Sequence, residues 1–309
     1  MTNNNKIMNK NGGGYEQKLE RFFIAIIKRC SKWLVLLLYT IQGISRIVRF
    51  AEWEKLPQAK SNRSLAILAN GPSLKAYQQK LDIFADKDVL CLNFFALTDD
   101  FLALKPKYYA LADPAFFVPR QDRLSEVLAK IDDMLEIFQT KIDWQMHIIV
   151  PSHMAIPTEM AKVLHKNKNL SLIKINEFYF EGFSLVERYL RKKQLMSFIF
   201  QNVVVMAISA GMFMGYKNIF LFGVDADWIK NITVGSDNKL YLDDTHFYGT
   251  QKRVIEDINM EIEMKALCTT FRMYGKIAAF AKENGINIYN TCEHSFIDTF
   301  PKINMLEGF

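Results

Sequence analysis

The chain has 309 residues, of which 50% are hydrophobic and 23% are charged. This composition excludes a disordered protein, which lacks the apolar surface needed to offset the entropy of ordering. The length is enough for one large domain or two small ones. The four cysteines form no CxxC pair, which argues against a zinc cluster and favours reduced thiols in a cytosolic compartment.

The net charge of +6 is concentrated at the N-terminus. Residues 1–63 contain 12 Lys and Arg against 4 Asp and Glu, a net +8, whereas the other 246 residues contain 27 against 29, a net −2. Because the basic excess lies wholly in the N-terminal arm, the body of the chain lacks the basic surface of a nucleic-acid-binding protein. We therefore expect no nucleic-acid partner.

Residues 1–21 are predicted to be a disordered lead-in, since the chain begins with a polar segment rich in Asn and Gly. Residues 22–60 are predicted to form a basic amphipathic helix. The longest uncharged run in it, Trp33 to Ser45, has 13 residues. A membrane-spanning helix needs ~20 apolar residues. No signal-peptide cleavage site follows in the expected place.

The predicted helix is expected to lie on an anionic membrane surface. Trp33, Tyr39 and Trp53 would sit at the level of the lipid headgroups, and the cations would face anionic lipid. The alternative is a helical hairpin that packs on the body of the chain or on a second subunit. In the second case the protein would be a homo-oligomer.

Residues 61–309 are predicted to form one Rossmann-like α/β domain, a mostly parallel sheet with helices on both faces. Short β-prone runs alternate with amphipathic stretches, and several runs are apolar throughout, as in strands covered on both sides. The predicted strands are Leu65–Ala69, Val89–Leu92, Tyr108–Ala112, His147–Val150, Leu170–Ile175, Asn218–Phe222 and Ile286–Tyr289. The predicted helices lie near residues 74–84, 119–140, 182–196, 201–214 and 252–284.

In such sheets ligands bind beyond the carboxyl ends of the strands, so the residues that follow each strand are the candidate site. Asn70-Gly71-Pro72-Ser73 follows the first strand. Gly71 allows a tight turn, and Ser73 is expected to cap a helix whose free N–H groups would suit a phosphate. The segment is neither G-x-G-x-x-G nor a Walker loop, and an ordinary β-turn-α connection is the alternative.

Asn93 follows the second strand and Asp113 follows the third. Such side chains bind ribose hydroxyls or a base edge, and they also commonly cap the next helix. Thr291 and Ser295 follow the last strand, in a polar loop that would face the same crevice.

Asp225-Ala-Asp227 follows the strand that ends at Phe222. This D-x-D pattern holds a divalent metal on nucleotide-sugar diphosphates in some enzymes, but three-residue patterns arise by chance and a metal is not favoured. The alternative for Asp225 is to orient an acceptor hydroxyl or to accept its proton.

Residues 229–244 are predicted to be a polar loop that leads to His246. Histidine titrates near neutrality, and carboxylates precede His246 in the sequence, so it is the best candidate for a general acid or base. Tyr248 would donate a hydrogen bond to a leaving phosphate. A solvated or structural role is the alternative for a lone histidine.

Four segments resemble the bacterial sialyltransferases of glycosyltransferase family 42. Residues 67–75 (ILANGPSLK) resemble the opening strand and nucleotide loop, residues 214–225 (MGYKNIFLFGVD) a later strand, residues 245–250 (THFYGT) the histidine loop, and residues 290–295 (NTCEHS) the closing loop. A related group carries the same segments: the hydroxymethylpterin-pyrophosphokinase-like domain of motility accessory factors and surface-polysaccharide loci. The phrases KPKYYALADPAFF and GVDADW look closer to that group.

The resemblance implies metal-independent transfer from a CMP-activated nine-carbon sugar. Asn70, Gly71 and Ser73 would contact the phosphate and cytidine, and Asn93 would reach the nucleotide. Asp113 stands where the family has Asn, which puts that contact in doubt.

Two further positions depart from the family. Residues 201–204 (QNVV) replace a Thr-Ser-Gly stretch near the donor, which leaves Asn202 as the polar candidate there. Thr250 stands where the family has its catalytic base, the second histidine of H-x-x-G-H, and His246 matches the first histidine. Either His246 has taken over the base role, or the donor or the chemistry differs.

The sequence therefore predicts a peripheral glycosyltransferase at the cytoplasmic face of the inner membrane. It would move sialic acid or a similar sugar from a CMP-linked donor to a surface glycan or glycolipid. His246 would act as the base, and Tyr248 and the N–H groups of residues 71–74 would stabilise the departing phosphate. One alternative is a diphosphokinase-like transfer from ATP that uses a metal on Asp225 and Asp227. The other is a non-catalytic scaffold that binds a nucleotide sugar.

Overall fold

The computed structural model describes residues 12–49, 56–59, 63–246, 249–255 and 258–306. Their contacts divide the chain into two units. Residues 1–51 and 179–193 make up the first, here called the arm unit, and residues 52–178 and 194–309 make up the second, the sheet unit. The sequence placed residues 179–193 in the Rossmann-like domain, whereas the contacts group them with the N-terminal helix.

The sheet unit is built on seven parallel strands in the order β10-β6-β1-β2-β3-β4-β5. All seven predicted strands are present, so the predicted α/β fold class is confirmed. The apolar runs form strands because both faces of the sheet are covered. The strands are β1 (Ser64–Leu68), β2 (Lys87–Leu92), β3 (Tyr108–Ala110), β4 (Met146–Pro151), β5 (Leu170–Ile175), β6 (Asn218–Phe222) and β10 (Asn287–Asn290).

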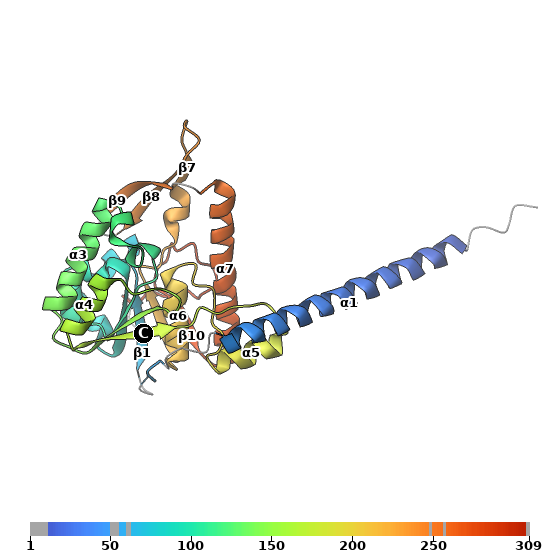
Figure 1. The fold of residues 1–309 in the computed structure, drawn as a ribbon, viewed down its shortest axis with the longest axis horizontal. Coiled ribbons are helices and arrows are strands. Elements are labelled where there is room, and N and C mark those ends of the chain that lie inside the picture. Colours follow the sequence, from blue (N-terminus) through green and yellow to red (C-terminus); the bar gives the residue numbers. More distant parts are fainter. Residues whose placement is uncertain (1–11, 50–55, 60–62, 247–248, 256–257, 307–309) are drawn as a thin grey trace, which may run out of the picture. The chain divides into compact units, whose positions relative to one another are not determined.

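Helices cover both faces of this sheet (Figure 1). On one face α6 (Val203–Phe213) packs on β1, β2 and β3, and α7 (Met260–Glu283) packs on α6 and β10. The opposite face carries α3 (Ser125–Thr140), α4 (Thr158–Lys166), the short α2 (Asp100–Leu104) and several 3-10 segments.

Alternate residues of β1 show the two faces, because successive side chains of a strand point to opposite sides. Leu65 lies against Gly211 of α6, where an added Cβ would come within 2.6 Å of the leucine. Ala66 and Leu68 are buried in the core shared with α3 and α4.

The predictions for residues 229–244 and 252–284 were partly wrong. The first segment contains β7 (Ile232–Val234) and most of β8 (Leu240–His246), which form a three-stranded antiparallel sheet with β9 (Gly249–Ile255). The helix α7 begins only at Met260, after the Asn259 side chain caps it. The strand sequence LYLDDTH mixes apolar and charged residues and therefore lacks the continuous apolar run of a strand buried on both sides.

Two other elements differ from the prediction. The single helix expected near residues 74–84 is a pair of 3-10 segments, Pro72–Tyr77 and Leu81–Phe84, and α4 was not predicted. Short 3-10 segments lack the 3.6-residue apolar repeat on which a helix prediction depends.

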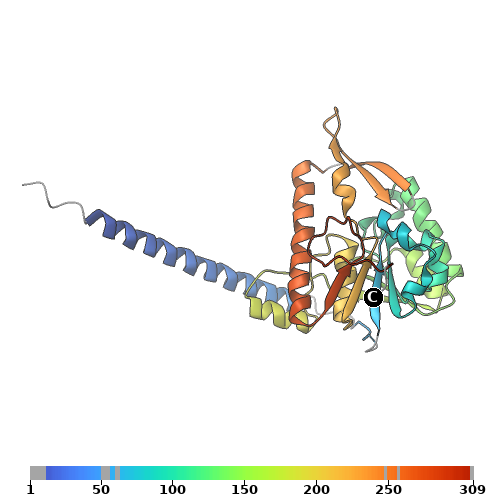
Figure 2. The same cartoon turned by 180° about the vertical axis from the view of Figure 1, so that it is seen from behind.

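The arm unit contains α1 (Gly12–Arg49) and α5 (Ser184–Lys192), which lie side by side in both views (Figures 1 and 2). The helix α1 begins at Gly12, so residues 12–21 are helical and the predicted disordered lead-in is too long. In the part of the chain that the structure describes, no helix has a stretch long and apolar enough to cross a membrane.

Candidate active site

The site lies where the strand order reverses, at the carboxyl ends of β1 and its neighbours. The chain runs from β1 through β5 on one side of β1 and then places β6 and β10 on the other side. In open α/β sheets, ligands bind at such a reversal, beyond the carboxyl ends of the central strands. Asn70 and Gly71 follow β1, Asn93 follows β2, and Asp225 follows β6, so four of the predicted residues come from adjacent strands.

The loops that leave β1 and β6 are in direct contact. The N–H of Gly71 donates to the carbonyl of Gly223 at 2.9 Å. A Cβ added to Gly71 would lie 2.0 Å from Oδ2 of Asp225 and 2.4 Å from the Gly223 oxygen. Gly71 has φ −71° and ψ 158°, which any residue can adopt. Glycine is therefore required here by the close approach of the two loops.

The Asp225 carboxylate holds three loops together. It is only 8% exposed. Its Oδ2 accepts from the Ser73 hydroxyl at 2.9 Å and from the Ser73 N–H at 3.3 Å. Its Oδ1 accepts from the Cys292 thiol at 2.7 Å. Burial and the bond to Asp225 raise the pKa of Cys292 to about 11, so the thiol keeps its proton at neutral pH and donates.

Two expectations about the loop after β1 are corrected by these contacts. Ser73 does not cap the following segment, because its hydroxyl donates to Asp225. The N–H groups expected to face a phosphate already have protein acceptors: Gly71 donates to Gly223, Ser73 to Asp225, and Leu74 to the Gly71 carbonyl. The Asp225 carboxylate thus accepts the Ser73 N–H that was predicted to face a phosphate.

The loop after β10 is tied to the loop after β6. The Asn290 side chain donates to the Val224 carbonyl at 3.1 Å, and the Ser295 hydroxyl donates to the same oxygen at 2.8 Å. The Thr291 hydroxyl donates to the Leu221 carbonyl at 3.0 Å. Thr291 and Ser295, both predicted to bind the donor, are buried and hold the loop in place. Asn290, the last residue of β10, and Cys292 belong to the same framework; both lie in the segment NTCEHS, but neither was predicted as a site residue.

Two asparagine side chains at this edge of the sheet have amide oxygens that accept no hydrogen bond from any described residue. The Asn70 amide donates to the Leu92 carbonyl at 3.3 Å, which brings it beside Asn93. Among the described residues, neither Oδ1 of Asn70 nor Oδ1 of Asn93 has a hydrogen-bond partner, although both atoms are buried. Asn93 also has φ +48°, a left-handed conformation that asparagine tolerates. Buried polar atoms are nearly always paired, so two unpaired acceptors on neighbouring strands are suited to a ligand that donates.

Asp113 and Asn202 cap short structures. Asp113 lies exposed beyond β3, and its Oδ1 accepts from the Ala115 N–H at 2.9 Å. Asn202 begins α6: its Oδ1 accepts from the Val205 N–H and its amide donates to the Tyr274 hydroxyl. The capping alternative holds for both residues, and their contacts to a donor stay predictions.

The remaining predicted residues lie in or beside the three-stranded sheet. His246 is the last residue of β8 and pairs with Gly249 of β9; its backbone is described but its side chain is not. The segment predicted to be a loop therefore contains the paired strands β8 and β9. Tyr248 lies outside the described residues. Asp227 opens a 3-10 segment, Asp227–Asn231, that contacts β8. The described residues contain no group of three or more His, Cys, Asp or Glu side chains placed to hold a metal.

No family model and no curated protein matches the sequence. Similar solved structures are sialyltransferases. The monofunctional α-2,3-sialyltransferase Cst-I of Campylobacter jejuni is 19% identical with a TM-score of 0.43, and the match covers 81% of this chain and 84% of that one. The sialyltransferase CstII of the same organism, in complex with the substrate analogue cytidine-5'-monophosphate, is 18% identical with a TM-score of 0.40. That match covers 79% of this chain and 86% of CstII.

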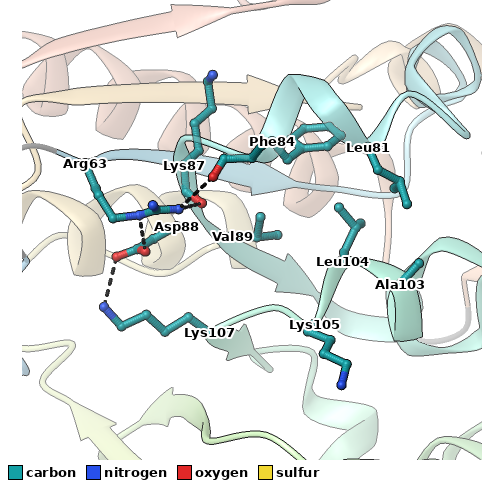
Figure 3. Close-up of a pocket in the computed structure, with 11 residues that line it drawn as sticks. Arg63, Leu81, Phe84, Lys87, Asp88, Val89, Ala103, Leu104, Lys105 and Lys107 are labelled. Carbon is teal, nitrogen blue, oxygen red and sulfur yellow. Dashed lines mark hydrogen bonds and ion pairs between the residues drawn. The ribbon is translucent and has the colours of Figure 1, made fainter.

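A cavity of about 290 Å³ lies at the opposite edge of the sheet, where β1, β2 and β3 begin (Figure 3). Asp88 is its central charge: Arg63 donates to Oδ1 at 2.8 Å, Lys107 donates to Oδ2 at 2.9 Å, and the buried Tyr216 hydroxyl also donates to Oδ2. Burial opposes ionisation of Asp88, but these hydrogen bonds prevail and lower its pKa. The cluster ties the strand starts together, and no predicted site residue lies in it.

Proposed function

We propose that this protein is a glycosyltransferase that moves a sugar, sialic acid or a similar keto-sugar, from a CMP-activated donor to a surface glycan or glycolipid. The donor would occupy the crevice at the carboxyl ends of β1, β2 and β6. Three lines support this: the resemblance of four sequence segments to sialyltransferases, the position of the crevice at the reversal of strand order, and the unpaired acceptors within it.

The observation that carries the proposal is the pair of unpartnered oxygens on Asn70 and Asn93. A nucleoside offers the donors they lack, in its ribose hydroxyls and in the exocyclic amino group of cytosine. A buried acceptor left without a donor costs about 1–3 kcal/mol, so a ligand that supplies the donors recovers that free energy. Their positions after strands made both residues candidates from the sequence, and the resemblance implies that both contact the nucleotide.

The chain's own residues would divide the chemistry as follows. His246 takes the proton of the acceptor hydroxyl as the new glycosidic bond forms, and the bond between the sugar and the CMP oxygen breaks. Tyr248 donates a hydrogen bond to the departing phosphate. Asp225 holds the loops after β1, β6 and β10 in register through Ser73 and Cys292, which is a positioning role.

The acceptor proposed here is bound to lipid or to a growing surface glycan, and the enzyme would reach it from the cytoplasmic face of the inner membrane. The helix α1 would bring it there. Trp33, Leu34, Leu38 and Tyr39 are all exposed on α1, and Lys28, Arg29 and Lys32 interrupt its apolar sequence. Apolar bulk mixed with cations is the pattern of a helix that lies in an anionic membrane interface.

The test is nucleotide binding by the variant Asn93→Gly. Glycine adopts φ +48° freely, so the substitution removes the amide and its unpaired oxygen without straining the backbone. Asn238→Gly is the matched control, since Asn238 has φ +58° in the exposed turn before β8. Thermal shifts would be measured with CMP, UDP, GDP and ATP, with and without EDTA.

A ligand at 100 times its dissociation constant stabilises the folded state by about 2.7 kcal/mol, or roughly 5 °C for a domain of this size. We expect that shift with CMP, insensitive to EDTA, in the wild type and Asn238→Gly, and its loss in Asn93→Gly. A shift with ATP that needs a metal would instead favour the phosphoryl transferase. CMP binding without donor turnover, in a protein where His246→Ala changes nothing, would favour the scaffold.

A further inference from the structure

The arm unit combines exposed apolar surface with nearly all of the positive charge. It contains 13 Lys and Arg against 4 Asp and Glu, a net +9, whereas the sheet unit contains 26 against 29, a net −3. Residues 179–193 contribute four of those cations, although they lie far from the N-terminus in the sequence. The structure thus joins a second basic segment to α1, which the sequence alone did not show.

One stripe of α1 is used to bind this segment. Trp33, Leu36, Thr40 and Gly43 are spaced by three, four and three residues, which places them on one side of a helix. The Trp33 ring lies 5.3 Å from the ring of Phe183, and the Thr40 hydroxyl accepts from the Phe183 N–H at 3.2 Å.

The contact between the two segments is close. A Cβ added to Gly43 would lie 2.5 Å from the Phe180 ring. The other sides of α1 keep their large apolar residues exposed.

The helix α5 has two contrasting sides. Glu187, Leu190 and Arg191 are buried; Glu187 accepts from the Gly182 N–H at 2.8 Å and pairs with Arg191 at 3.1 Å. The other side is an exposed stripe formed by residues at spacing i, i+3, i+4 and i+7: Leu185, Arg188, Tyr189 and Lys192. Leu185 is 73% exposed and Tyr189 is 60% exposed.

We infer that this exposed stripe of α5 is a second membrane-binding element, which inserts Leu185 and Tyr189 between the headgroups of an anionic phospholipid surface. Arg188 and Lys192 lie beside the two apolar side chains on this stripe, and the Lys192 cation would contact lipid phosphates. Tyrosine is enriched at the membrane interface, and the long side chains of cations beside it can extend to the lipid headgroups. The inference rests on the proposed membrane attachment of α1 and extends it to a segment that lies far from that helix in the sequence.

Charge argues for lipid rather than a second copy of the chain as the partner of this surface. Two arm units would bring together two faces of net +9, and the acidic residue of α5, Glu187, is already buried in its pair with Arg191. Like charges at short range repel, whereas an anionic bilayer attracts each nearby cation.

The test is sedimentation of the full-length protein with vesicles of phosphatidylcholine, with and without a minority of phosphatidylglycerol. We expect Leu185→Ser/Tyr189→Ser to weaken binding to the anionic vesicles about tenfold or more, since both side chains lose their apolar contact with lipid. Arg188→Ala/Lys192→Ala should weaken it about fivefold per charge removed and reduce its salt dependence.

Leu124→Ser is the matched control, because Leu124 is as exposed as these residues but lies in the sheet unit. All four side chains of the stripe are exposed, so the melting temperatures of the variants should equal that of the wild type. Unchanged vesicle binding by both double variants would overturn the inference. So would a wild-type dimer that the variants dissociate, since the stripe would then be a protein interface. CMP binding is measured separately, so loss of the membrane role leaves the transferase proposal standing.

Discussion

Replacing Gly71 with alanine tests the close approach of the loops after β1 and β6. The added Cβ would lie 2.0 Å from Asp225 Oδ2 and 2.4 Å from the Gly223 carbonyl. Relief of both overlaps requires the loops to separate by more than about 1 Å, which breaks the Ser73–Asp225 and Gly71–Gly223 hydrogen bonds. Overpacking destabilises the folded state by about 1–3 kcal/mol, and each lost hydrogen bond by about 1 kcal/mol. Alanine also reduces the conformational entropy of the unfolded chain, but this stabilises the protein by less than about 1 kcal/mol.

We therefore expect Gly71→Ala to lower the free energy of unfolding by about 2–4 kcal/mol and the melting temperature by roughly 4–8 °C. Urea denaturation at neutral pH measures the first quantity, and calorimetry the second. Gly275→Ala is the control: it lies within α7, no atom would come within 4 Å of its Cβ, and the substitution should stabilise by up to about 1 kcal/mol. A Gly71→Ala protein as stable as the wild type would refute the steric argument. In the Asp225→Ala background the same change should cost less, because one of the two overlaps is gone.

Three further predictions concern other parts of the chain. Asp88→Asn should lower the free energy of unfolding by about 1–2 kcal/mol at pH 7. Burial opposes ionisation of Asp88, but hydrogen bonding prevails and lowers its pKa in the folded state. The difference in stability from the wild type should therefore be present above about pH 4 and disappear as the pH falls through the folded pKa, as urea titrations at several pH values would show. In the native protein a maleimide should label the exposed Cys30 and Cys268 at neutral pH but not Cys292, whose thiol pKa is raised by burial to about 11; mass spectrometry that found Cys292 labelled first would contradict its place in the site. Gly43→Ala should speed amide exchange in the C-terminal part of α1, since its Cβ would overlap the Phe180 ring on which the helix packs, and unchanged exchange rates would exclude that packing.

The sheet could be predicted from the sequence because its strands are buried on both faces and so appear as continuous apolar runs. The strands β7, β8 and β9 carry no such run. Their pairing depends on partners across a hairpin, as in Asp243 opposite Lys252, which local composition does not reveal. The helical prediction over residues 252–255, which belong to β9, failed for the same reason.

The position of the site followed from a topological rule, but its internal contacts did not. That rule places ligands at the carboxyl ends of the central strands, and Asn70 and Asn93 do lie there. The bond between Ser73 and Asp225 joins residues 152 positions apart, so no local pattern indicates it. A serine after Gly-Pro suggested a helix cap, yet a buried carboxylate is the stronger acceptor and takes its hydroxyl.

The order of the strands has a consequence for biosynthesis. The central strand β1 pairs with β2 soon after both leave the ribosome, but its other edge must wait for β6, whose Ile219 pairs with Leu65. Until then one row of backbone donors and acceptors on β1 is open, and such edges invite pairing with other chains. The loop that ends at Ser73 likewise has no carboxylate to hold it until residue 225 has been made. The sheet is therefore complete only late in synthesis, after β6 has docked beside β1 and β10 beside β6.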